Sequence, residues 1–148
     1  MKIGLSNDHA ATDLKFVIKD YLESKGYEVV NYGTDGYESY DYPVAGRMLG
    51  EAVMKGEVDC GFAICGTGIG ISLAANKVRG IRAACVSEPV SARLAKEHNN
   101  AQIVCFGARI VGAELAKAIV DAYLQAEHLG GRHSRRVDMI MQIEEENR

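Results

Sequence analysis

The chain has 148 residues, of which 47% are apolar and 25% charged, which suits one globular domain over residues 1–148 with a substantial core. Its formal net charge is −3 and it contains no long basic run, so we expect no nucleic-acid or membrane partner. No apolar run approaches the length of a signal or transmembrane segment, which predicts a cytoplasmic protein.

Short apolar runs typical of strands alternate with stretches typical of helices along the whole chain. Strands are expected at residues 2–6, 28–31, 58–65, 82–86 and 103–106, and helices at 11–25, 44–55, 68–77, 89–97, 112–126 and 134–147. A polar loop at 33–43, rich in Tyr, Asp and Gly, is long enough to form part of a site. The alternation predicts an α/β fold in three layers, α/β/α, with a five-stranded parallel sheet and an extra C-terminal helix.

The stretch from Ile64 to Gly70, Ile-Cys-Gly-Thr-Gly-Ile-Gly, joins the third strand to the third helix. Its three glycines let backbone N–H groups turn inward as an anion nest, and the helix N-terminus adds partial positive charge. The same field favours the thiolate form of Cys65, so this thiol can act as a base or nucleophile near neutral pH. The alternative is a purely structural role for this stretch, as a tight turn that holds a buried cysteine.

Other uses of a glycine-rich turn fit this sequence less well. A cysteine-based phosphatase needs Arg six residues after the Cys, where Ile71 stands, and Lys77 comes too late for a P-loop. The glycines at 66, 68 and 70 form the pattern Gly-x-Gly-x-Gly, whereas the dinucleotide fingerprint is Gly-x-Gly-x-x-Gly. Glu88 nevertheless stands about 20 residues further on, where an acid that binds the NAD ribose is expected. A nucleotide- or phosphate-binding module without catalysis therefore remains the rival hypothesis.

The remaining cysteines, Cys60, Cys85 and Cys105, form no Cys-x-x-Cys pair with one another or with Cys65. The cysteines of this chain lie mostly in or beside apolar runs, where a reduced cysteine behaves as a small hydrophobe. We therefore expect neither disulfides nor a zinc cluster.

Polar residues stand at both edges of the predicted sheet. Asp8 and His9 follow the first strand and share the carboxyl edge with Cys65, where active sites of such sheets lie, although Asp8 also suits a plain helix cap. His98 and Asn99 close the fourth helix, where a C-terminal cap is the plain alternative. Residues 130–136 form a basic turn with Gly-Gly beside three arginines. Such a turn is either a solvated charged surface or a site that binds a phosphate group.

Taken in order, these pieces resemble the ribose-5-phosphate isomerase B family. The matching pieces are Asp8-His9, Cys65 to Gly70, Ala74 to Lys77, Gly80 to Ala83, Ser87 to Pro89, His98-Asn99, Gly107 to Arg109, and Gly130 to His133 with Arg136. The resemblance implies a Rossmann-like homodimer, or a dimer of dimers, that interconverts ribose 5-phosphate and ribulose 5-phosphate. It also implies that the only small-molecule partner is a sugar phosphate, with no metal and no organic cofactor. Allose 6-phosphate is the alternative substrate.

The resemblance also assigns roles to residues. Cys65 is the expected base for a cis-enediolate, and His98 is the acid that opens the furanose ring; Thr67 and Asp8 complete the expected catalytic set. The expected substrate contacts are Asp8, His9, Gly66, Thr67, Gly68, Ile69, Gly70, Asn99, Arg109, Arg132 and Arg136. A branch of the family lacks the Cys and uses a Glu at the position of Ile71 as its base. The absence of this Glu here favours Cys65 as the base. Gln102 stands where relatives mostly carry Asn.

The β-α order separates these groups within one chain. Cys65 lies at the carboxyl edge of the sheet, whereas His98 and Arg136 follow helices that return to the other edge. A five-residue strand at about 3.3 Å per residue leaves roughly 15 Å between the two groups. No side chain spans that distance, so we expect a two-fold homodimer whose active sites are shared between subunits.

Overall fold

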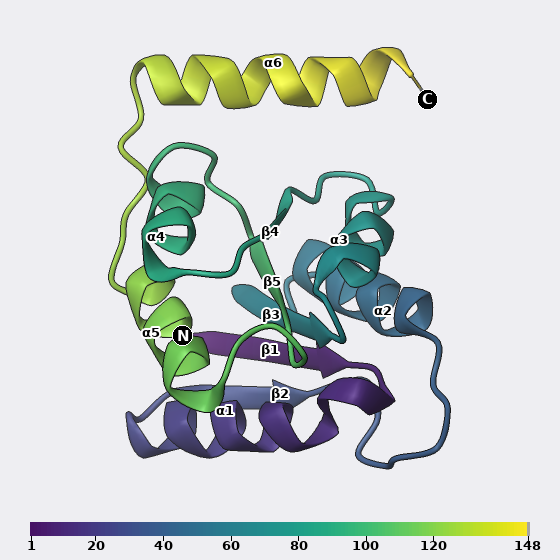
Figure 1. The fold of residues 1–148 in the computed structure, drawn as a ribbon. Coiled ribbons are helices and arrows are strands. Elements are labelled where there is room, and N and C mark those ends of the chain that lie inside the picture. The colour runs from purple at the N-terminus through teal and green to yellow at the C-terminus, as the bar shows by residue number, and fades with distance from the viewer. Residues whose placement is uncertain (148) are drawn as a thin grey trace.

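A computed structural model describes residues 1–147 and contains one parallel five-stranded sheet (Figure 1). The strands are β1 (Lys2–Asn7), β2 (Glu28–Asn31), β3 (Cys60–Cys65), β4 (Ala83–Cys85) and β5 (Ile103–Gly107). Their order across the sheet is β2-β1-β3-β5-β4, and every neighbouring pair is parallel. The five-stranded parallel sheet predicted from the sequence is therefore confirmed.

Helices cover both faces of the sheet. They are η1 (His9–Ala11), a 3-10 turn, followed by α1 (Thr12–Ser24), α2 (Tyr42–Met54), α3 (Ile69–Asn76), α4 (Pro89–Glu97), α5 (Ala113–Leu124) and α6 (Arg132–Glu146). Figure 1 shows α1, α4 and α5 against one face and α2 and α3 against the other. Successive β3 residues alternate between two cores, with Phe62 and Ile64 in the first and Ala63 and Cys65 in the second, because a central parallel strand is buried on both faces.

Two helix starts differ by two residues from the sequence-based expectation. Helix α2 begins at Tyr42 rather than Val44, because Pro43 lies in its first turn, where the missing N–H of proline costs nothing. Helix α6 begins at Arg132 rather than Ser134, so residues expected in a basic turn lie on a helix instead. Arg132 and Arg136 consequently share one face of α6, being four residues apart.

Lys15 on α1 is fully buried, although its charge predicts exposure. Its ammonium group donates to the carbonyl of Thr34 over 2.8 Å and pairs with Asp35 over 2.6 Å. The Lys15 hydrogen bond also lowers the pKa of Asp35. The lysine thereby fixes the loop after β2 to α1, and this loop leads to Tyr42.

Helix α6 lies across one end of the molecule, beside α4 at its start and beside α3 at its end (Figure 1). Val137 is its one buried side chain, whereas Ile140 is 46% and Ile143 61% exposed. An amphipathic helix with an exposed apolar face lacks part of its packing surface within the chain. In residues 1–147, no helix combines the length and the apolar character needed to cross a bilayer.

Candidate active site

Cys65 ends β3 and lines an open cavity of about 440 Å³ at the carboxyl edge of the sheet. The cavity walls contain Asp8, Tyr42, Cys65, Gly66, Thr67, Ile69, Gly70, Leu73 and Arg109. Seven of these nine residues belong to the site set predicted from the sequence. The carboxyl ends of β1, β3 and β5 meet at this edge, so residues far apart in the chain converge on one thiol.

The Cys65 sulfur has a hydrogen-bond donor from its own turn. The N–H of Gly68 points to Sγ over 3.1 Å, and the Cys65 residue is only 4% exposed. The Thr67 hydroxyl oxygen accepts the N–H of Ile69 over 3.1 Å, which leaves the hydroxyl hydrogen available to donate. One turn therefore supplies a hydrogen-bond donor to the sulfur and a hydroxyl donor beside it.

Two glycines allow this turn to pack tightly on the end of β5. Gly68 has a φ of +83°, and a Cβ there would lie 2.7 Å from the Phe106 backbone. A Cβ on Gly107 would lie 2.5 Å from the Thr67 backbone. Both positions therefore require glycine, and their close contact fixes the backbone N–H groups around Cys65.

Arg109 brings a positive charge to the same turn. Its N–H donates to the carbonyl of Gly66 over 3.0 Å, which places the residue directly after β5 beside the turn. A Cβ on Gly66 would lie 3.2 Å from the Arg109 guanidinium, so this group lies over the glycine. An anion in the cavity would meet a guanidinium as well as backbone donors.

Asp8 and His9 follow β1 and have different surroundings. Asp8 accepts the N–H of Ala10 over 3.0 Å, so it caps the 3-10 turn while it also lines the cavity. His9 accepts the N–H of Tyr40 at Nδ1 over 3.0 Å. Because a backbone N–H can only donate, the neutral His9 ring carries its proton on Nε2. His9 is not among the residues that line the cavity.

The sequence-based prediction missed Tyr42 and Leu73. The Tyr42 ring lies on Gly70, where a Cβ would come within 2.5 Å of the ring. Thr12 holds the preceding loop through its hydroxyl, which donates to the carbonyl of Gly36 over 2.7 Å. The only signal in the sequence is the tyrosine-rich loop itself, which does not reveal which tyrosine lines the cavity.

The three other cysteines are free and favour the protonated thiol. Burial raises the pKa of Cys60 to about 11 and raises the pKa of Cys105 well above its usual value. The pKa of Cys85 is raised by burial first and by neighbouring Cys65 second. Near neutral pH these three thiols remain protonated and are therefore poor nucleophiles.

The second group of predicted residues lies elsewhere in the chain. His98, Asn99, Arg132 and Arg136 do not line the Cys65 cavity. His98 is the C-cap of α4, and its ring stacks on that of His133 with centroids 4.2 Å apart. Figure 1 shows the start of α6 beside α4, away from the ends of β1 and β3 that carry the cavity. The predicted site residues therefore form two separate groups within one chain.

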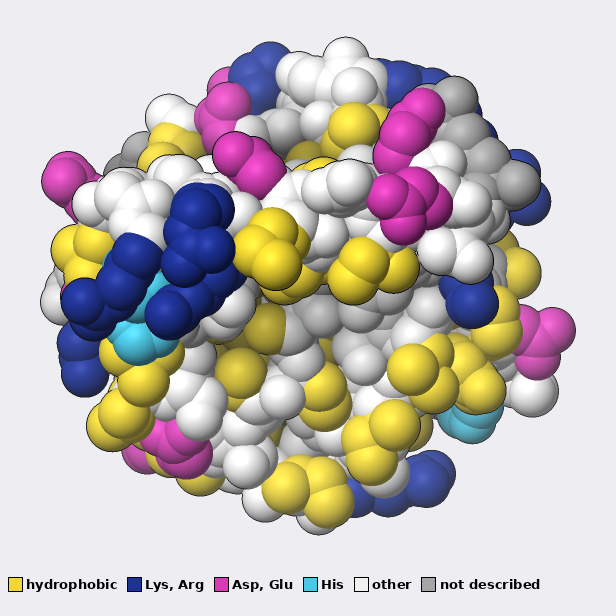
Figure 2. All heavy atoms as spheres, turned by 90° about the horizontal axis from the view of Figure 1, so that it is seen from above, with side chains coloured by type: hydrophobic (Ala, Val, Ile, Leu, Met, Phe, Trp, Pro, Cys, Tyr) yellow, Lys and Arg dark blue, Asp and Glu magenta, His cyan; other side chains and the backbone are white. Residues whose placement is uncertain are grey.

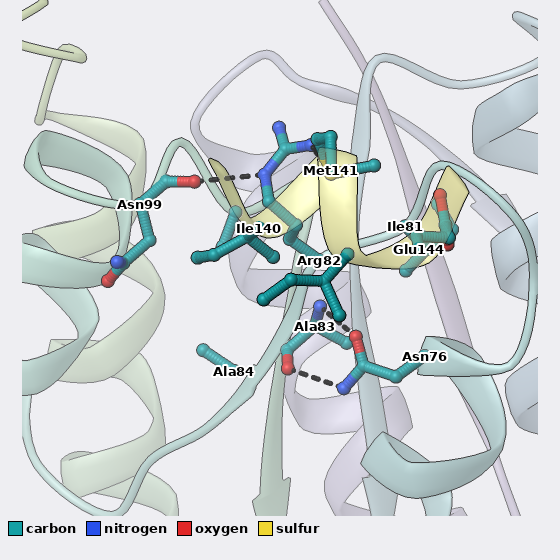
Figure 3. A pocket seen from close by; sticks show the side chains of 11 residues that line it. Asn76, Ile81, Arg82, Ala83, Ala84, Asn99, Ile140, Met141 and Glu144 are labelled. Carbon is teal, nitrogen blue, oxygen red and sulfur yellow. Dashed lines mark hydrogen bonds between the residues drawn. The ribbon is translucent and has the colours of Figure 1, made fainter. Parts of the chain in front are cut away.

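Asn99 lines a different cavity, of about 430 Å³, between β4 and α6 (Figure 3). Arg82 donates to the carbonyls of Asn99 and Asn100 over 3.0 and 2.8 Å, which holds the turn after α4. Gln102 accepts the N–H of Arg82 over 2.7 Å and donates to the carbonyl of Gly80 over 2.8 Å. The glutamine thus supports the turn that carries His98 and Asn99.

Glu88, the acid that supports the nucleotide-binding hypothesis, is used as a helix cap. Both carboxylate oxygens accept the N–H of Ser91, at 2.9 and 3.0 Å. This hydrogen bonding lowers the pKa of Glu88. A carboxylate engaged at the start of α4 has less capacity to bind a ribose, so the structure gives the rival hypothesis little support.

Comparison with known proteins relates the whole chain to sugar-phosphate isomerases. The family model described as Ribose/Galactose Isomerase matches residues 3–140. Ribose-5-phosphate isomerase B of Escherichia coli is 50% identical over 144 residues, which cover 97% of each chain. The Clostridium thermocellum ribose-5-phosphate isomerase B structure is 52% identical, with a TM-score of 0.98 and full coverage of both chains. The Mycoplasma genitalium enzyme, solved with bound ribulose-5-phosphate, is 39% identical, with a TM-score of 0.94 and coverage of 98% and 97%.

Proposed function

Because the chain belongs to the ribose/galactose isomerase family and is an isomerase of the ribose-5-phosphate isomerase B type, we propose that Cys65 is its catalytic base. The proposed reaction interconverts D-ribose 5-phosphate and D-ribulose 5-phosphate through a cis-enediolate. The observation that carries the proposal is the Cys65 sulfur: Cys65 lines a cavity together with Asp8 and Arg109, and its sulfur accepts a hydrogen bond from the Gly68 N–H over 3.1 Å.

The chemistry requires one base and several donors. The Cys65 thiolate takes the proton from C2 and returns it to C1, while a proton passes from the C2 hydroxyl to the C1 oxygen. Aldose and ketose then differ only in the position of these hydrogens, so no electron acceptor is needed. A positioned base of this kind contributes about 10²- to 10⁴-fold to the rate.

The turn after β3 stabilises the enediolate. The Thr67 hydroxyl and the remaining N–H groups of Gly66 to Gly70 are the proposed donors to its oxygens. Arg109 and Asp8 bind the substrate from either side of the turn, and His9 binds it from the adjacent 3-10 segment. One well-placed donor of this type is worth about 3 kcal/mol to a developing oxyanion.

We propose that the phosphate and the furanose ring are handled by a second copy of the chain. His98 would protonate the ring oxygen, and Asn99, Arg132 and Arg136 would bind the substrate, all from the partner subunit. Within one chain these residues do not line the Cys65 cavity, which is why the proposal requires two subunits. A two-fold homodimer then contains two equivalent composite sites.

Exposed apolar side chains support this assembly. Ile69 and Leu73 at the cavity are 57% and 63% exposed, and Ile140 and Ile143 on α6 are exposed as well. Figure 2 shows hydrophobic side chains spread over the face seen from the α6 side. Exposed apolar side chains of this kind favour contact with another chain, and a second copy brings the missing site residues with it.

A direct assay tests the function. Ribose 5-phosphate and allose 6-phosphate are supplied separately in metal-free buffer, and the expected result is faster turnover of ribose 5-phosphate. Iodoacetamide should abolish turnover, and a sugar phosphate should protect the enzyme because it covers Cys65. Absence of turnover with both substrates, together with tight binding of NAD or AMP, would instead support the non-catalytic module.

A further inference from the structure

The rings of His98 and His133 form a stacked pair. Their centroids are 4.2 Å apart and their planes differ by 5°. His98 ends α4, and His133 lies in the first turn of α6, so the contact joins two elements that are distant in sequence. Face-to-face contact restricts the rotation of both rings.

Separate hydrogen bonds hold the two elements together. The N–H of Leu129 and the Nδ1 of His128 both donate to the carbonyl of Glu97, over 3.0 and 2.9 Å. Because a carbonyl only accepts, Nδ1 of His128 carries a proton, and in the neutral ring Nε2 accepts the Ser134 hydroxyl over 3.0 Å. The start of α6 is therefore fixed to the end of α4 independently of the stacked rings.

The surroundings of His133 disfavour its protonation. Burial lowers the pKa of this half-buried histidine, and the nearby His98, Arg132, Arg136 and His128 lower it further. Figure 2 shows Lys and Arg side chains gathered around a histidine at one side of the face seen from above. Glu97, which directly precedes His98 in the chain, is paired with Arg93 over 2.7 Å. His133 therefore remains neutral near neutral pH.

We propose that His133 is a positioning residue for His98: it presents a neutral flat surface that holds the His98 ring in the orientation and proton state required for ring opening. This inference rests on the proposed role of His98 as the ring-opening acid. Two imidazolium rings in this stack would repel each other, which disfavours protonation of both rings at once. His133 itself need not touch the substrate.

Three substitutions separate the features of the His133 ring. His133→Phe keeps a flat neutral ring, His133→Ala removes the ring, and His133→Arg keeps a planar group with a permanent charge.

The first measurement is an NMR titration of the His98 ring, with the four histidine signals assigned by single substitutions. In the wild type, His98 should take up its proton at a higher pH than His133. The His98 midpoint in the Arg variant should lie about one pH unit below that in the Phe variant.

The second measurement compares two aldose phosphates. Erythrose 4-phosphate cannot close a furanose ring, because its C4 oxygen is esterified, so it needs no ring opening. The ratio of kcat/KM for ribose 5-phosphate to that for erythrose 4-phosphate should fall about tenfold in the Ala and Arg variants and stay within about threefold in the Phe variant.

Equal His98 midpoints in the Phe and Arg variants would overturn the inference about the proton state. An Ala variant with the same kcat/KM ratio as the Phe variant would overturn the positioning role. If the wild type turned over no sugar phosphate, the proposed function would fail, whereas the NMR titration would still decide whether the two rings are coupled. Thermal melting of all three variants shows which of them remain folded for the comparison.

Discussion

The N–H of Gly68 donates to the sulfur of Cys65 over 3.1 Å, so the turn that forms the cavity also supplies a donor to the thiol. The N–H of Gly68 therefore has its partner inside the turn and supports the base, leaving other donors for the substrate. This relationship divides the turn between two tasks: one N–H for the thiolate, and further donors for the oxygens of the enediolate.

Cys65→Ala should abolish isomerisation while binding of ribose 5-phosphate persists, because the substitution removes the base and leaves the groups that bind the phosphate. The expected loss of kcat is at least about a hundredfold, with a dissociation constant near that of the wild type. Initial rates and isothermal titration calorimetry give the two quantities. Cys85→Ala, at a free cysteine that does not line the Cys65 cavity, is the control and should retain activity. Residual Cys65→Ala activity above a few per cent would assign the base elsewhere.

His98→Asn should impair only substrates that need ring opening. We expect kcat/KM for ribose 5-phosphate to fall about 10²- to 10⁴-fold, because a general acid is lost, and kcat/KM for open-chain erythrose 4-phosphate to fall far less. Both values come from initial rates with the same enzyme preparation. Equal losses on the two substrates would remove His98 from the ring-opening role.

Arg136→Ala should raise KM for ribose 5-phosphate with little change in kcat if the arginine binds phosphate equally in the ground and transition states. Loss of a charged hydrogen bond worth about 1.5–3 kcal/mol corresponds to roughly a ten- to hundredfold increase. Arg135→Ala is the matched control, because Arg135 is exposed on the same helix and outside the predicted site. An unchanged KM in Arg136→Ala would make this arginine part of a solvated surface.

Gly107→Ala should reduce activity although it removes none of the proposed catalytic or binding side chains. Its Cβ would lie 2.5 Å from the Thr67 backbone, so the turn that carries the donors must move. We expect a loss of about 1–3 kcal/mol in the free energy of unfolding and a reduced kcat. Gly112→Ala is the control, since a Cβ there meets nothing within 4 Å and the loss should stay below about 1 kcal/mol. Chemical denaturation gives the free energy of unfolding, and initial rates give kcat. Equal losses of both quantities in the two variants would refute the packing argument.

Hybrid dimers test the shared site. Inactive Cys65→Ala and His98→Asn are mixed under conditions that exchange subunits, and each hybrid then contains one doubly altered site and one intact site. Random pairing makes about half of the dimers hybrids, so activity should recover to about a quarter of the wild-type value if the sites act independently. Native mass spectrometry verifies the exchange. A mixture that stays inactive after exchange would place each complete site within one chain.

Much of the architecture follows from local patterns in the sequence. Alternating strand and helix signals predicted the parallel sheet, and the limits of most elements agree within one or two residues, because apolar periodicity and glycine turns act over short stretches of chain. The carboxyl-edge rule for parallel sheets correctly brought Asp8 and Cys65 to one cavity, and Arg109, which only the family resemblance had indicated, lines it as well. The sequence alone also excluded two other uses of the glycine turn: Ile71 excludes a cysteine-based phosphatase loop, and the position of Lys77 excludes a P-loop.

Other features depended on packing between distant segments, which no local pattern encodes. The burial of Lys15 is possible only because the loop after β2 supplies a carbonyl and a carboxylate to its ammonium group. Tyr42 reaches the cavity because Gly70 leaves room for its ring, and His133 meets His98 because the start of α6 is tied to the end of α4. The sequence therefore determined the order of the elements and the chemistry at their ends, whereas tertiary contacts decided which side chains meet, because those contacts depend on the packing of whole elements against one another.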